Sequence, residues 1–245
     1  CTSPCIPGNC NVWTVSQMTT TNFTNFSNTF VQGDFVIITH PSLRTGTTDW
    51  VSSYAAHRES LIGGNHNATI INVEELYDQF AWGISKHPLS IRNFINYAID
   101  TWSVEPQYLF LVGKSVSYES VTNNPLAYPA CLVPTWGHHP SDNMLTVRDF
   151  SSYIPQIPVG RLSAKNPAEV QAYYEKMLSY DQDRNCTEND RSWTKKVIHV
   201  ANGHNITEMN QYLGYVNSYK DIVEAPYYAG TVVGTFTQSS YTPPP

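Results

Sequence analysis

Charged residues are scarce in this chain of 245 residues. Only 14% of them are Asp, Glu, Lys or Arg, and the formal net charge is −6, whereas roughly 25% is usual for a soluble protein. No stripe of Lys and Arg is present, which excludes the electrostatic footprint of nucleic-acid or anionic-membrane binding. No apolar run approaches the roughly 20 residues that cross a bilayer. We therefore expect neither nucleic acid nor membrane insertion.

A phosphate-binding loop is also missing. The first apolar, β-branched run, 35–39, leads into Thr39-His40-Pro41-Ser42, whereas nucleotide-binding α/β domains place a Gly-rich turn there. This absence disfavours a simple flavodoxin-like domain.

Cysteine is infrequent but clustered. Cys1, Cys5 and Cys10 crowd the N-terminus, while Cys131 and Cys186 stand alone. A tight cluster in a charge-poor chain predicts an extracytoplasmic setting, secreted or at a bacterial cell surface, with disulfides. The odd count leaves one thiol free or paired elsewhere. The alternative is a metal site on the cluster, but zinc takes four ligands and no His lies nearby.

Composition divides the chain into three predicted parts. Residues 1–32 form an irregular Cys- and Thr-rich leader, and 33–183 a first α/β subdomain. Residues 184–245 form a polar linker and the truncated start of a second subdomain. The chain begins at Cys1 without Met and closes on three prolines, so we expect a piece of a longer protein.

Strand and helix patterns alternate from residue 33 onward. Buried strands are predicted at 35–39, 68–73, 108–112, 154–159 and 197–201. Helices are predicted at 49–63, 76–80, 91–102, 166–180 and 209–216, with start signals such as Asp49 and Asn166-Pro167-Ala168-Glu169. The strand at 108–112 does not alternate, as expected when helices cover both faces. The order predicts an open, mostly parallel sheet with helices on both faces.

Six short segments occur in an order typical of one family. They are Leu76-Tyr77-Asp78-Gln79-Phe80, Ser90-Ile91-Arg92-Asn93-Phe94, Leu111-Val112-Gly113, Val133-Pro134-Thr135, Ser141-Asp142 and Ile157-Pro158-Val159-Gly160-Arg161-Leu162. The residues and the order of these segments resemble those of the gingipain-like cysteine peptidases, which have a caspase-like fold. They are most similar to those of the sortase-like members that process cargo of the type IX secretion system. The resemblance runs from about Phe35 to Tyr219 and covers the first subdomain and the opening of the second.

The resemblance implies a cysteine endopeptidase that hydrolyses or transfers peptide bonds of protein or peptide substrates. The family carries its catalytic His and Cys in the second subdomain, the His on a His-Gly loop. Here no His follows His204 and no Cys follows Cys186. We therefore expect no catalytic residue in this chain and both beyond residue 245. The remainder of the second subdomain would be its partner, and the isolated chain would be inactive.

One segment is a candidate for substrate binding. His204 and Glu208 follow the predicted strand 197–201 and open a helix, and ligands of open α/β sheets sit at the carboxyl ends of strands. In Arg-cleaving gingipains, an acid on this segment recognises the basic side chain, and the resemblance places Glu208 there. The alternative is that Glu208 only favours the helix N-terminus.

The long excursion 114–152 holds the remaining candidates. Cys131 with His138 or His139 is a conceivable dyad. The alternative is a loop anchored by a buried Cys, with two surface imidazoles. The two histidines with Asp142 and Asp149 are weak zinc candidates, and the two aspartates alone are weak calcium candidates.

Two further observations bear on those metal candidates. The family often has an acid after the 108–112 strand, but this chain has Lys114, which weakens a calcium site. We expect no cofactor. Arg161 is expected to fix the exit of its strand through an ion pair or carbonyl contacts.

A rival from another functional class is a catalytically inactive, gingipain-shaped surface module that binds protein or glycan. Abundant Tyr and Trp and low charge suit such a surface. A His-Gly loop followed by a later Cys downstream would favour the enzyme, and their absence would favour the module.

Overall fold

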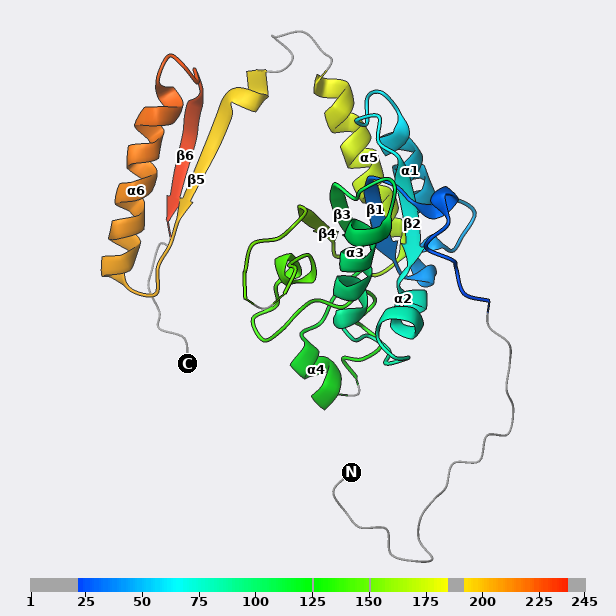
Figure 1. Ribbon diagram of the computed structural model, residues 1–245. Helices are drawn as coiled ribbons and strands as arrows, with labels where there is room; N and C mark the ends of the chain where they lie inside the picture. Colours follow the sequence, from blue (N-terminus) through cyan, green and yellow to red (C-terminus); the bar gives the residue numbers. More distant parts are fainter. Residues whose placement is uncertain (1–21, 125, 150, 185–191, 238–245) are drawn as a thin grey trace, which may run out of the picture. The chain divides into compact units, whose positions relative to one another are not determined.

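The computed structural model describes residues 22–124, 126–149, 151–184 and 192–237 (Figure 1). Packing divides the chain into two compact units, Cys1–Gln171 and Ala172–Pro245, and each is described by itself. The cysteine cluster at the N-terminus and Cys186 lie outside the described residues.

The first unit is built on a four-stranded parallel sheet in the order β2-β1-β3-β4. Its strands are β1 (Phe35–Thr39), β2 (Ala68–Asn72), β3 (Tyr108–Val112) and β4 (Val159–Leu162). Phe35 lies opposite both Ala68 and Tyr108, so β1 and its two neighbours start in register. The predicted open parallel sheet is confirmed.

Helices flank this sheet on both faces (Figure 1). On one face lie α2 (Val73–Phe80) and α3 (Leu89–Thr101), and on the other lies α1 (Trp50–Glu59). The excursion after β3 carries α4 (Tyr118–Asn123), and α5 (Pro167–Arg184) follows β4 and runs across the boundary between the two units. Short 3₁₀ turns are η1 (Thr29–Val31), η2 (Pro41–Arg44) and η3 (Asp142–Leu145). One sheet face, with Val36 and Ile38, shares the main core with α2 and α3. The other face meets α1, where the Tyr54 ring lies between those of Phe35 and Phe110. Every residue of β1 is consequently buried.

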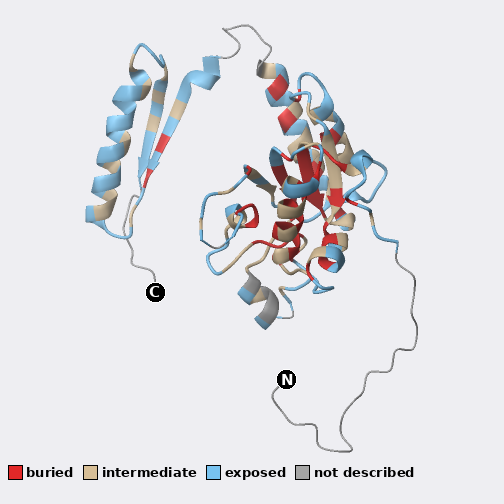
Figure 2. Cartoon of the chain, in the orientation of Figure 1, coloured by how far each residue is buried: buried red, intermediate tan, exposed pale blue. Residues whose placement is uncertain are grey.

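The helix predicted at 91–102 is α3, and its apolar stripe forms the centre of the core. Ile91, Phe94, Ile95, Ala98 and Trp102 recur at helical spacing and are buried, whereas Ile99 is partly buried. Figure 2 shows this buried zone between α3 and the sheet. Phe26 packs into the same core, with its ring centroid 5.0 Å from that of Phe94. Phe26, which lies in the predicted leader 1–32, is therefore part of the core of the first unit.

Two element boundaries differ from the predictions. The strand expected at 154–159 is β4, Val159–Leu162, and Ile154 is exposed. Pro155 and Pro158 cannot donate ladder hydrogen bonds, so pairing begins after them, and β4 lies at the sheet edge. The helix expected to reach Gly63 ends at Glu59, because the backbone of Ser60 becomes extended, with φ −69° and ψ 156°.

The second unit is a strand–helix–strand segment. It comprises η4 (Ser192–Lys195), β5 (Lys196–Ala201), α6 (Ile206–Glu224) and β6 (Thr231–Thr237). β5 and β6 pair in parallel, and α6 packs against both strands. Strand β6 was not predicted. None of the helices in the described ranges combines the length and the apolarity that crossing a membrane requires.

We predict that Phe94→Ala lowers the free energy of unfolding by about 3–5 kcal/mol, because it leaves a cavity in a fully buried aromatic cluster. Phe30→Ala is the matched control: its side chain is 94% exposed, so the change should stay within about 0.5 kcal/mol. Urea titration followed by tryptophan fluorescence measures both. Equal losses in the two variants would contradict this description of the core.

Candidate functional site

At the carboxyl edge of the four-stranded sheet, the guanidinium of Arg161 on β4 donates hydrogen bonds to several neighbouring residues. Its Nε and one Nη donate to the two carboxylate oxygens of Asp142, each at 2.7 Å. Its two Nη atoms also donate to the main-chain carbonyls of Gly113, Val133 and Pro134, at distances of 2.8 to 3.0 Å. All five N–H donors of the guanidinium are thereby used.

This network joins three segments that are far apart in sequence. Gly113 ends β3, Val133 and Pro134 belong to the long excursion, and Asp142 begins η3. Gly113 has a φ of +150°, and a Cβ there would lie 2.7 Å from Cγ2 of Val133, so a side chain would push the excursion away. The predicted role of Arg161 at the strand exit is confirmed.

The candidate metal ligands have other partners. Both oxygens of Asp142 accept from Arg161, and Asp149 accepts from the main chain and hydroxyl of Ser151. His138 forms an ion-pair contact of 3.2 Å with Glu119, and the His139 ring lies against that of His138. Within the described ranges, no three His, Cys, Asp or Glu side chains gather as a metal site. The structure brings no zinc or calcium ligand set together there.

Cys131 is a buried thiol at the base of the excursion. Burial raises the pKa of this thiol, against smaller lowering effects from the Val116 main chain, Lys86 and Arg161, so the thiolate that a nucleophile needs is disfavoured. His138 and His139 lie exposed at the surface. This arrangement agrees with the anchored loop rather than with a Cys-His dyad.

Glu208 stands at the third position of α6, in a capping box. The His204 N–H donates to one carboxylate oxygen at 2.7 Å, and the Glu208 N–H donates to Oδ1 of Asn205 at 2.9 Å. The Tyr212 hydroxyl donates to the other carboxylate oxygen at 2.9 Å. The main-chain bond from His204, followed by that from Tyr212, lowers the pKa of Glu208. The carboxylate is therefore ionised and held in place just beyond β5, with His204 exposed beside it.

Sequence reasoning missed a cavity at the carboxyl ends of β1 and β2. It has a volume of about 410 Å³, and its lining includes Thr39, Arg44, Asp49, Asn72 and Glu75. Polar residues directly after two neighbouring strands were the signal that could have found it.

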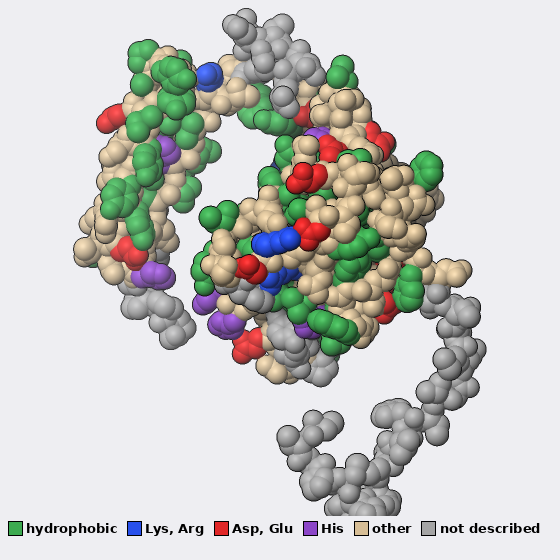
Figure 3. All heavy atoms as spheres, viewed as in Figure 1, with side chains coloured by type: hydrophobic (Ala, Val, Ile, Leu, Met, Phe, Trp, Pro, Cys, Tyr) green, Lys and Arg blue, Asp and Glu red, His purple; other side chains and the backbone are tan. Residues whose placement is uncertain are grey.

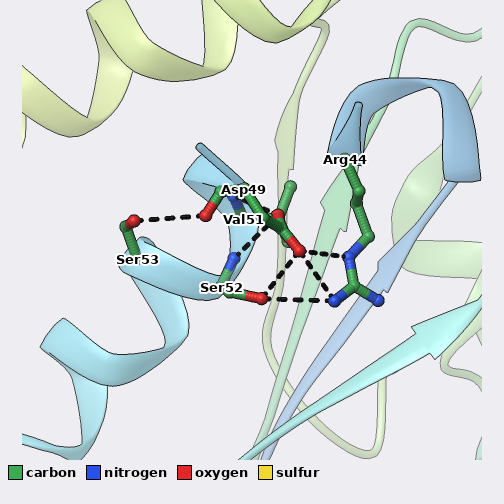
Figure 4. A network of polar contacts seen from close by, with 5 residues as sticks. All are labelled: Arg44, Asp49, Val51, Ser52 and Ser53. Carbon is green, nitrogen blue, oxygen red and sulfur yellow. Dashed lines mark hydrogen bonds and ion pairs between the residues drawn. The ribbon is translucent and has the colours of Figure 1, made fainter. Parts of the chain in front are cut away.

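One wall of this cavity is a fixed polar network (Figure 4). Arg44 donates to Asp49 at 2.8 Å and to Ser52 at 3.2 Å, while Asp49 accepts the N–H groups of Val51 and Ser52 at the start of α1. Burial acts to raise the pKa of Asp49, but the bonds from Ser52 and Arg44 together bring that pKa below its usual value. The arginine is thus committed to the helix cap that Asp49 was predicted to form.

We predict that Arg161→Met costs about 3–5 kcal/mol of unfolding free energy, because it leaves the partly buried Asp142 carboxylate unpaired. The side chains of this pair are 10% and 24% exposed. Arg148→Met is the control: its pair with Asp100 is equally short, 2.7 Å, but 52% and 48% exposed, so its loss should change the free energy of unfolding much less. Thermal and urea unfolding measure both variants, and a loss of under 1 kcal/mol for Arg161→Met would refute the role of this network.

Comparison with known proteins assigns the family. The model of peptidase family C25 matches residues 28–242. Among curated proteins no match is found.

Three solved structures are similar in fold. The Arg-specific cysteine proteinase gingipain R has a TM-score of 0.53 and 13% identity, covering 90% of this chain and 44% of that one. A structure described only as a protease has a TM-score of 0.53 and 14% identity, covering 85% and 40%. Dimeric latent PorU from Porphyromonas gingivalis has a TM-score of 0.49 and 14% identity, covering 74% and 21%.

This chain therefore spans less than half the length of each of these proteins. At such identities the structural likeness shows the fold alone, which agrees with the predicted caspase-like arrangement. The family match covers most of the chain, and the chain belongs to peptidase family C25, the gingipain family.

Proposed function

We propose that this chain is the N-terminal, non-catalytic part of a gingipain-like cysteine endopeptidase, with the catalytic Cys and His supplied beyond residue 245. The parent would hydrolyse peptide bonds, or transfer them as a sortase, through a thioester. The family match over residues 28–242 carries this proposal. The state of Cys131 supports it, because a buried thiol of raised pKa is unsuited to nucleophilic attack.

The first unit would act as a rigid wall of the substrate cleft. Arg161 holds the end of β3 and the excursion together by five hydrogen bonds. A cleft lined by loops needs such fixed support, because loops by themselves place side chains imprecisely.

The second unit would be completed by the rest of its own subdomain. Ile198, Val200 and Phe236 are exposed on the sheet face that α6 leaves bare, and no residue of α6 is buried. Hydrophobic side chains are visible along this unit in Figure 3. Contiguous exposed apolar surface usually marks a contact site, and further strands and helices of the same subdomain would cover it.

Glu208 would recognise a basic side chain of the substrate. Its carboxylate is ionised, fixed by two hydrogen bonds, and placed where the chain leaves β5. A carboxylate that is already oriented loses little conformational freedom when it pairs with a guanidinium. We place the protein outside the cytoplasm, secreted or on a bacterial surface, on the basis of its low charge and its cysteine cluster.

One observation favours the rival binding module. Tyr212, Tyr215 and Tyr219, followed by Ile222, recur at helical spacing on α6 and are all exposed. Tyrosine is enriched at the centres of protein interfaces, because it buries a large area at small entropic cost. In an inactive gingipain-shaped protein, this stripe would contact a protein or glycan.

We predict that residues 1–245 alone hydrolyse no peptide, whereas the longer product of the same reading frame does so and is inactivated by iodoacetamide. Both proteins are assayed side by side on a peptide library with fluorogenic leaving groups. Hydrolysis by residues 1–245 that survives both Cys131→Ala and iodoacetamide would refute the cysteine mechanism. A longer frame without a His-Gly loop and a later Cys would favour the binding module.

In the longer protein, Glu208→Gln should lower kcat/KM for peptides with Arg or Lys before the cut by about 30-fold, because it removes one member of a charge pair. Glutamine keeps the capping box, so folding should be retained. Asp221→Asn, an exposed acid on the same helix, is the control and should leave kcat/KM unchanged. An equal loss on peptides with neutral residues at that position would sink the recognition role.

A further inference from the structure

A second cavity lies at the carboxyl end of β1 and uses groups that have no role above. Its volume is about 320 Å³, and its wall includes His40, Glu74, Tyr77, Asp78, Lys86 and Tyr128. These residues come from the loop after β1, from α2, from the turn after α2, and from the excursion after β3. In the strand order β2-β1-β3-β4, the chain moves from β1 to one side and then crosses to the other. Open α/β sheets bind ligands at this reversal of strand order.

The Tyr77 hydroxyl is the first sign of a ligand. The residue is 5% exposed, and its hydroxyl is buried with no hydrogen-bond partner among the described residues. Native proteins rarely leave a buried hydroxyl unpaired, and an exception calls for a water or a ligand. Tyr77 packs into the core on one side and lines this cavity on the other.

The second indication of a ligand is a set of positively and negatively charged side chains that no neighbouring charge neutralises. Lys86 donates to the main-chain carbonyl of Tyr128, and its ammonium lies 4.0 Å from the centroid of the Tyr128 ring. Both of these partners are neutral. Among the described residues, neither Lys86 nor Asp78 has an ion-pair partner. The cavity therefore presents one ammonium that no carboxylate pairs with.

The carboxylate side of the cavity is similarly unpaired. Glu74 and Asp78 are one helical turn apart on α2 and so share one face. The ion-pair contact of Glu74 is to Nε2 of His40, at 3.5 Å. Burial, more than any neighbouring charge, lowers the pKa of His40, so this imidazole is neutral at pH 7 and does not offset the carboxylate. Two carboxylates and one ammonium thus surround the same space.

We propose that this cavity binds a small zwitterion of amino-acid or dipeptide size. The carboxylate of the ligand would pair with Lys86, its ammonium with Glu74 and Asp78, and a polar atom between them with the Tyr77 hydroxyl. An anion alone would meet two carboxylates, and a cation alone would meet Lys86. The volume lies at the small end of the usual range for ligand sites. No catalytic residue takes part, so this site stands or falls independently of peptidase activity.

Isothermal titration of residues 1–245 with alanyl-alanine tests the proposal. N-acetyl-alanyl-alanine lacks the ammonium and alanyl-alanine amide lacks the carboxylate, and each should bind at least tenfold more weakly. L-Alanine distinguishes the two sources: tighter binding of alanine assigns a free amino acid, and tighter binding of the dipeptide assigns a peptide with free ends. Absence of binding by both zwitterions, or equal binding of the blocked forms, would overturn the proposal.

Variants locate the binding in this cavity. Lys86→Gln and Asp78→Asn should each weaken binding of the zwitterion at least tenfold, whereas Lys220→Gln, an exposed lysine on α6, should not. Tyr77→Phe should weaken binding while leaving the melting temperature of the free protein unchanged or raised, because it removes an unpaired buried hydroxyl. A lower melting temperature for Tyr77→Phe would show that the hydroxyl already has a partner, and wild-type affinity in Lys86→Gln would exclude the site.

Discussion

The guanidinium of Arg161 is the contact on which the rest of the first unit depends. Its donors reach the end of β3, the middle of the excursion and η3. A bidentate pair with Asp142 fixes both the position and the plane of the group. The residue sits on an edge strand of only four residues, so the same contacts that order the excursion also hold β4 on the sheet.

At the carboxyl edge of the first sheet, polar groups that are already hydrogen-bonded within the fold are not available for other chemistry. Asp142 is hydrogen-bonded to Arg161, and Asp49 is hydrogen-bonded to Arg44 and to the start of α1. A carboxylate in such a network is a poor metal ligand, because a metal must compete with bonds already made. Lys86, whose partners are neutral, and Tyr77, whose hydroxyl has no partner among the described residues, both line the cavity at the carboxyl end of β1.

Local patterns in the sequence predicted most of the fold. Strands β1 and β3 are uninterrupted apolar runs, the apolar residues of α3 repeat at helical spacing, and Asn166 with Glu169 forms the predicted helix start. The start of β4 was misplaced because two prolines, rather than hydrophobicity, decide where pairing begins. The cavity around Tyr77 was not predictable, because its wall combines four separate segments and no period links them. The role of Arg161 was predictable in kind, but its carbonyl partners emerge only from the folded chain.

The bare face of the second unit has a consequence for synthesis of the protein. All four strands of the first sheet lie within residues 35–162, so that sheet is complete on the ribosome before β5 emerges. The β5–α6–β6 segment then appears with Ile198, Val200 and Phe236 uncovered. Exposed apolar faces on partly made domains are the surfaces through which nascent chains associate wrongly. The second unit is therefore the part of this chain for which a chaperone would matter most.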